Sequence, residues 1–313
     1  MLAINKILFP TDLSDCAHRA FQHAVFLANW HDAELVILNV AGRHMYDYSA
    51  LKEHFPYRDE DLASMLEASS ERQQPAPSLS ELAIRQIQLE KASASVGILD
   101  VAEEEEADAI VMGTHGRRGA NRLLMGSVAE EVVRGAPCPV LTIRDDGTVA
   151  PGQAVRRILV PLDFSELSEE ALRYARELAL TYGARLDLLH VVEDISLPSA
   201  YGAGPVDIVV PDVVENSERY LADLADRVLG HEHVVAHVIP GYAVSTILDF
   251  TDRNDIDLMV IATHGRSGVE RLMMGSVAER VIRRVQCPVF TVKSLGKSLV
   301  SAPEAEEASA STS

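Results

Sequence analysis

The chain has 313 residues, of which 47% are hydrophobic and 24% are charged, and its formal net charge is −19. This composition is typical of soluble globular proteins, and the length suits about two domains. No apolar run approaches the ~18 residues of a membrane span, and so acidic a surface repels nucleic acid and anionic membranes. The acidity fits a salt-rich cytoplasm and plain solubility equally well, so both explanations stay open.

The first residues of the chain are predicted to form a strand and not a targeting segment. Its N-terminus lacks the apolar stretch and cleavage site of a signal peptide, so we expect a cytoplasmic protein without membrane insertion. A helix within 41–80 is only weakly indicated, because that segment is polar and contains three prolines. Short apolar runs predict strands at KILFP (6–10), ELVILNV (34–40), IRQIQLE (84–90), DAIVMG (108–113) and PVLTI (139–143).

The second half repeats this alternation. Strands separated by helices imply βαβ units with right-handed crossovers and a parallel sheet. In such doubly wound, Rossmann-like sheets, ligands lie outside the carboxyl ends of the strands, where the strand order reverses. Strands are predicted at 156–161, 185–191, 233–239, 257–262 and 288–292, and helices at 165–182, about 212–229, 243–253 and 275–285.

The two halves are copies of one unit. Residues 7–40 and 158–191 are identical at 13 of 34 positions, and residues 110–143 and 259–292 at 20 of 34. The sequence therefore predicts tandem α/β domains at 1–146 and 154–293, joined by a segment rich in Gly, Pro and Asp. Residues 294–313 have few large apolar side chains after Val300 and are predicted to be a disordered tail.

The cysteines do not suggest a disulfide framework, because Cys16, Cys138 and Cys287 form an odd and sparse set. Cys138 and Cys287 each precede the proline of a predicted strand. We interpret both as small buried hydrophobic residues and not as redox groups.

Three histidines, His231, His233 and His237, fall on one face of a predicted strand. Zinc binding is one interpretation. However, the outer two would lie roughly 20 Å apart on a straight strand, too far to share a metal. A solvated edge-strand face is favoured, and no metal site is predicted.

A glycine-rich segment, GTHGRRGANRLLMGS (113–127), joins the fourth strand to a helix predicted to begin at Ser127. Glycines let a ligand approach the backbone, and a helix N-terminus offers N–H groups and a positive dipole end to phosphate. Arg117 and two further arginines add positive charge, and the Ser127 hydroxyl can donate to phosphate. A structural alternative is a capping box of Ser127 and Glu130, which explains neither the glycines nor the arginines. The P-loop lysine and the GxGxxG pattern are both absent.

With this motif, the chain resembles the ATP-binding group of the universal stress protein family, in tandem form. That group carries G-x2-G-x9-G-[ST], and the resemblance covers residues 4–293. The first half fulfils the motif with Gly113, Gly116, Gly126 and Ser127. The second half, ATHGRSGVERLMMGS (262–276), departs from it only at Ala262. A β-carbon there costs much only if the local φ is positive, so the first site is the safer expectation.

The resemblance implies five-stranded sheets in the order 3-2-1-4-5 and an adenine nucleotide in each. It directs Asp12 and Asp163 toward adenosine, although Asp12 could instead only cap the helix that begins near Ser14. His115 and His264 either orient the loops or touch phosphate. The residues expected to bind nucleotide are Asp12, Val40, Gly113, His115, Gly116, Arg117, Gly126, Ser127 and Val128, and Asp163, Val191, Ala262, His264, Gly265, Arg266, Gly275, Ser276 and Val277.

The last strand of each half would be a bare edge. In the family this strand mediates dimerisation, so we expect the two halves to pair within one chain, and two chains to form a homodimer. The expected ligand is ATP, with or without Mg²⁺, and the expected role is a regulatory stress-response protein that acts on an unnamed protein partner. A slow ATP hydrolase and a nucleotide-free structural protein are the alternatives. No catalytic residue is assigned, because near the loops only Asp12 and Asp163 are duplicated carboxylates.

Overall fold

The computed structural model describes residues 2–42, 55–70, 82–115, 125–144, 155–193, 195–197, 206–208, 211–228, 233–264, 274–293 and 299. Within these ranges, the helices are too short or too polar to cross a membrane. The first half contains β1 (Lys6–Pro10), α1 (Asp15–His31), β2 (Glu34–Gly42), α3 (Asp59–Ser70), β3 (Ile84–Lys91), α4 (Ala94–Glu104), β4 (Ala109–Gly113), α5 (Ser127–Gly135) and β5 (Val140–Ile143). The second half contains β6 (Arg157–Pro161), α6 (Glu166–Tyr182), β7 (Arg185–Val192), β8 (Ile195–Leu197), β9 (Val206–Ile208), α7 (Pro211–Val228), β10 (Val234–Pro240), α8 (Ala243–Arg253), β11 (Leu258–Ala262), α9 (Ser276–Arg284) and β12 (Val289–Val292).

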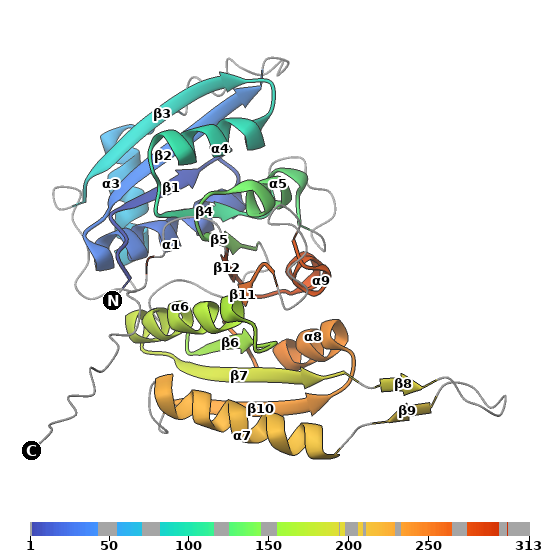
Figure 1. Ribbon diagram of the computed structural model, residues 1–313. Coiled ribbons are helices and arrows are strands. Elements are labelled where there is room, and N and C mark those ends of the chain that lie inside the picture. The colour runs from blue at the N-terminus through green and yellow to red at the C-terminus, as the bar shows by residue number, and fades with distance from the viewer. Residues whose placement is uncertain are drawn as a thin grey trace, which may run out of the picture.

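Ten strands form one continuous sheet in the order β10-β7-β6-β11-β12-β5-β4-β1-β2-β3 (Figure 1). Each half contributes five parallel strands in the order 3-2-1-4-5, which confirms the predicted α/β class and sheet order. The halves meet where β12 pairs antiparallel with β5, with Phe290 opposite Leu141. The expected pairing of the two halves within one chain is therefore confirmed.

Helices cover both faces of the sheet. Helices α1, α3, α6 and α7 supply buried side chains to the apolar layer on one face, and α4, α5, α8 and α9 to the layer on the other. The N-termini of α1 and α6 are capped alike, because Ser14 accepts a hydrogen bond from Ala17 N at 3.2 Å and Ser165 accepts one from Ser168 N at 3.2 Å.

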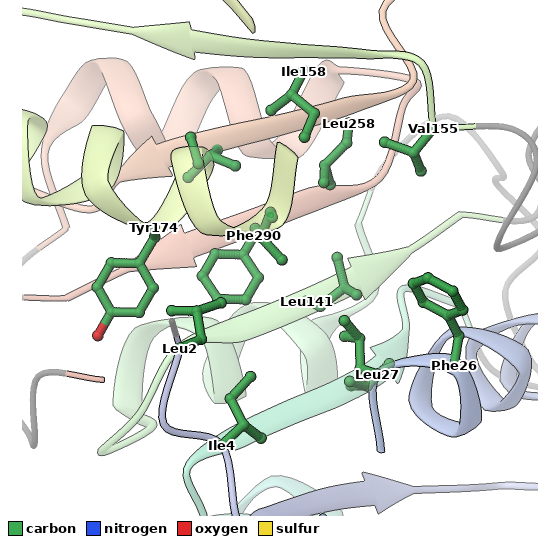
Figure 2. Packing of buried hydrophobic residues seen from close by; sticks show 14 of the residues in the cluster. Leu2, Ile4, Phe26, Leu27, Leu141, Val155, Ile158, Tyr174, Leu258 and Phe290 are labelled. Carbon is green, nitrogen blue, oxygen red and sulfur yellow. The ribbon is translucent and has the colours of Figure 1, made fainter. Parts of the chain in front are cut away.

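The first of these apolar layers runs without interruption from one half into the other. Figure 2 shows Phe290 of β12 beside Leu141 of β5 and Tyr174 of α6. The Tyr174 and Phe290 rings lie 5.8 Å apart between centroids, and all three side chains are buried. Hydrophobic burial therefore reinforces the backbone bonds of the joint.

Three features differ from expectation or lay beyond it. The weakly indicated helix of the first half is α3, and a short antiparallel hairpin, β8–β9, was not predicted. Leu299, in the segment predicted to be a disordered tail, is 2% exposed. Its N–H donates to the Tyr174 hydroxyl at 2.9 Å, and its carbonyl accepts from Ala3 N at 2.9 Å. Residues 294–298 and 300–313 lie outside the described residues.

The edge strand β10 is fastened to the sheet by a buried carboxylate. Asp187 of β7 is fully buried and receives hydrogen bonds from His237 Nε2 at 3.0 Å and from two nitrogens of Arg157 at 3.0 and 3.1 Å. Burial alone would raise the pKa of the Asp187 carboxyl, but these donors outweigh it and lower the pKa to about 2. His237 thus belongs to the hydrogen-bonded cluster around Asp187, while His231 lies outside the described residues.

The cysteines behave as small apolar residues in the structure. Cys16, Cys138 and Cys287 are buried, and none of them takes part in a disulfide. Burial raises the pKa of the Cys138 thiol to about 12, so it carries no thiolate near neutral pH. The interpretation of Cys138 and Cys287 as buried hydrophobic residues is confirmed.

Candidate functional site

The second half contains a cavity of about 490 Å³ at the carboxyl ends of β6, β7 and β11, beside the start of α9. Its volume falls within the usual range of small-molecule sites, roughly 300–1,000 Å³. Of the nine residues expected there, seven line it: Asp163, Val191, Ala262, His264, Gly275, Ser276 and Val277. Gly265 and Arg266 lie outside the described residues.

A sharp turn at the end of β6 orients Asp163. Phe164 has φ 61°, and Leu13 at the equivalent place in the first half has φ 63°. Such left-handed conformations cost free energy for a non-glycine residue and tend to occur at functional sites. Asp163 Oδ1 accepts hydrogen bonds from the N–H and the hydroxyl of Ser165, at 3.1 and 2.5 Å. The helix cap and the candidate adenosine carboxylate therefore form one hydrogen-bonded unit.

In the first half the equivalent turn is connected to the glycine loop. Asp12 Oδ1 accepts from Ser14 N at 3.1 Å, and the Ser14 hydroxyl donates to His115 O at 3.4 Å. The alternative in which Asp12 itself caps α1 is wrong, because the side chain of Ser14 is the cap.

Both loops are closed at their base by a backbone hydrogen bond. Gly126 N donates to Thr114 O at 2.9 Å, and Gly275 N donates to Thr263 O at 2.7 Å. A β-carbon on Gly126 would lie 2.7 Å from the Thr114 oxygen, so only glycine fits this closure. The loop thereby returns to the strand tip at the point where the helix begins.

The helix starts do not follow the capping-box alternative. The cap positions of α5 and α9 are Gly126 and Gly275, with no side-chain cap bond, and Ser127 and Ser276 are the first helical residues. The N–H groups of a first helical turn have no acceptor within the helix. They and the adjacent serine hydroxyls are therefore the groups that an anion meets at this end.

Gly113 packs closely against helix α1. A β-carbon there would lie 2.9 Å from Cys16 Sγ and 3.0 Å from the carbonyl carbon of Cys16, so contact with this helix is enough to require glycine. Its φ is not positive, so conformational strain does not explain the glycine. In the second half Ala262 fits with 8% exposure and lines the cavity.

The histidines of the loops are held by their neighbours. Thr263 Oγ1 donates its proton to Val292 O at 3.2 Å, so it accepts from His264 Nδ1, which lies 3.0 Å away. Thr114 Oγ1 and His115 Nδ1 form the matching pair at 2.8 Å. These bonds fix the ring orientation, which agrees with an orienting role.

Two further candidates of the first half, Val40 and Val128, lie on described elements. Val40 lies on β2, where its side chain would be only 2.9 Å from a β-carbon on Gly97. Val128 is in the first turn of α5. Gly116 and Arg117 lie outside the described residues.

Sequence reasoning missed two residues that line the cavity of the second half, His190 and Glu193. His190 lies next to Val191, hydrogen-bonds through Nδ1 to Leu162 O at 2.7 Å and stacks on Phe164 with centroids 4.0 Å apart. Glu193 is a second carboxylate in the lining, and Gly42 holds the equivalent place in the first half. His190 could have been found from the sequence, because it directly precedes Val191 at the end of a predicted strand. Within the described residues, no three His, Cys, Asp or Glu side chains cluster as metal ligands do.

Comparison with known proteins identifies the repeat. A sequence model of the universal stress protein family matches residues 3–144 and again 154–293. A universal stress protein of Mycobacterium bovis is 29% identical over 194 residues, which span 60% of this chain and 62% of that protein. One from Mycolicibacterium smegmatis is 25% identical over 302 residues, spanning 92% of this chain and 96% of that protein. The crystal structure of a universal stress protein from Archaeoglobus fulgidus superposes with a TM-score of 0.62 at 24% identity, covering 92% and 98% of the two chains.

Proposed function

Because the chain belongs to the universal stress protein family, we propose that it is a regulatory protein that binds ATP in each half. The observation that carries the proposal is one cavity in the second half that is lined by Asp163 together with His264 and Ser276, about a hundred residues further along the chain. It offers a carboxylate at the end of β6 and, at the start of α9, N–H groups that have no acceptor within the helix. These suit an adenosine and a phosphate chain respectively.

The lining is better suited to binding than to rapid turnover. Efficient ATP hydrolysis needs a group that positions water and a metal that neutralises the developing charge. Mg²⁺ bound through the phosphates needs only one or two protein carboxylates, and Asp163 and Glu193 are the carboxylates of this lining. Glu193 has no acidic counterpart in the first half, so any hydrolysis would be slow and confined to the second site. We propose a non-enzymatic role in which nucleotide occupancy changes the affinity for a protein partner.

The adenosine end is tested by calorimetric titration with ATP, ADP and AMP, with and without magnesium. Replacing Asp163 with alanine removes charge-assisted hydrogen bonds of about 1.5–3 kcal/mol, so affinity should fall roughly 10- to 100-fold. Asp223→Ala on α7 is the matched control, because this side chain is 66% exposed and lies on a surface helix. Wild-type affinity in both Asp12→Ala and Asp163→Ala would contradict the assignment.

The phosphate end is tested by Ser276→Asp. An acidic residue in the first helical turn stabilises the helix through its dipole while it repels phosphate. The variant should therefore melt no lower than wild type and yet lose nucleotide binding, whereas Ser276→Ala keeps the N–H groups and most of the affinity. Unchanged ATP affinity in Ser276→Asp would refute this placement. Turnover on the order of several per second would refute the non-enzymatic role.

A further inference from the structure

The residue that follows the last strand of each half is a cation, and each cation reaches into the other half. Arg144 follows β5 and Lys293 follows β12, at equivalent positions of the repeat. Arg144 Nη2 donates to Arg283 O at 3.2 Å, and its Nη1 donates to Val285 O. Lys293 Nζ donates to Ala136 O at 2.9 Å.

The acceptors of these bonds are the final carbonyls of two particular helices. Ala136 is the C-terminal cap residue of α5, and Val285 is that of α9. These are the helices whose N-termini stand at the proposed phosphate sites. A cation at the C-terminal end stabilises the helix dipole whose positive end faces an anion. Each helix has nine residues, so its N-terminus lies only about 13.5 Å from the C-terminal end that the cation contacts.

Each cation is also joined to the loop of its own half. Thr114 N donates to Ile143 O at 2.8 Å, directly before Arg144, and Thr263 N donates to Val292 O at 2.9 Å, directly before Lys293. The strand end that carries the cation is thus bonded to the base of one loop, while the cation holds the helix of the other site.

Direct contact between the two helices strengthens this connection. Glu130, in the first turn of α5, pairs with Arg283, in the last turn of α9, at 2.5 Å. Arg144 itself is 5% exposed. Because solvent is largely excluded around its guanidinium group, the charge interacts more strongly with its neighbours than it would in water.

We propose that Arg144 is a positioning residue for the nucleotide site of the second half and Lys293 for that of the first, so that the two sites are energetically coupled across the β5–β12 joint. The inference rests on the proposed function. It adds a crossed dependence in which each site requires a side chain from the opposite half.

The test isolates one site at a time. Ser127→Asp disables the first site and Ser276→Asp the second, and ATP affinity is then measured by calorimetry with Arg144→Met or Lys293→Met added. We expect a loss of about 3- to 10-fold in the crossed pairs, S127D with R144M and S276D with K293M. The uncrossed pairs, S127D with K293M and S276D with R144M, should change less than twofold. With Arg144→Lys in place of Arg144→Met, the second site should keep most of its ATP affinity, because Lys293 makes the equivalent helix contact in the other half.

A second measurement separates this inference from the proposed function. Amide hydrogen exchange without nucleotide should be faster in α9 but not in α5 for Arg144→Met, and the reverse for Lys293→Met. Equal changes in both helices, or in neither, would overturn the crossed arrangement even if ATP binds. A wild-type chain that binds no ATP, but shows crossed exchange, would refute the proposed function and leave the crossed support standing.

Discussion

Placing alanine at position 113 should destabilise the first half, because helix α1 leaves no room for a methyl group. The added β-carbon would lie 2.9 Å from Cys16 Sγ, 3.0 Å from the carbonyl carbon of Cys16 and 3.1 Å from Ala17 N. Two of these atoms belong to the backbone of a capped helix start and cannot rotate away. Overpacking of this kind typically costs about 1–3 kcal/mol, and we expect Gly113→Ala to lower the free energy of unfolding by that amount.

Urea unfolding followed by tryptophan fluorescence measures this cost, since the only tryptophan of the chain, Trp30, is on α1 in the same half. Adding Cys16→Ala should recover part of the loss by removing the thiol contact, while the backbone contacts stay. The matched control is Ala262→Gly, which removes a buried methyl and should cost roughly 0.8 kcal/mol. A Gly113→Ala variant within about 0.5 kcal/mol of wild type, inside the range of ordinary surface substitutions, would refute the packing argument.

Three further outcomes are expected. Leu299→Ala should cost about 2–3 kcal/mol in thermal or urea unfolding, because it empties a buried position beside Tyr174; an unchanged midpoint would place this residue outside the core. The Cys138 thiol, with its pKa raised to about 12, should react with an aromatic disulfide at pH 8 only after unfolding, and rapid labelling of the native chain would contradict its burial. Asp187, bonded to His237 and with a pKa lowered to about 2 from 3.8, contributes stability above pH 4 that is lost as the pH falls toward 2. Asp187→Asn should therefore be less stable at pH 7 and lose less between pH 4 and 2, and parallel stability curves would exclude this linkage.

Most of the sheet was predictable because its strands are short apolar runs repeated in two copies. The strand predicted at 233–239 is observed at Val234–Pro240, and the helix predicted at 243–253 is observed there. The β8–β9 hairpin was not predictable in this way, since each of its strands has only three residues and shows no period. Leu299 was missed for another reason: the residues that follow Val300 are small or polar, and its partner Tyr174 lies 125 residues away in sequence.

The sequence indicated most of the second-half residues that line the cavity, but it did not indicate the contacts that each residue makes. Spacing alone left a helix cap open as an alternative role for Ser127, because Ser followed three residues later by Glu fits that motif. The structure places the cap one residue earlier, where Gly126 bonds to Thr114 O. Likewise, the sequence assigned Gly113 to the ligand-binding loop, but only the structure shows how closely this position packs against helix α1. Roles that depend on which backbone lies nearby are set by tertiary contacts, which a local pattern does not contain.

The antiparallel joint between β5 and β12 lies inside a single polypeptide, and this changes how the pairing responds to concentration. Separate subunits joined in this way would come apart on dilution, as mass action requires. Tethered halves face one another at an effective concentration on the order of millimolar, whatever the number of molecules in the cell. The paired state is therefore as well populated in a cell that makes a few copies as in one that makes thousands.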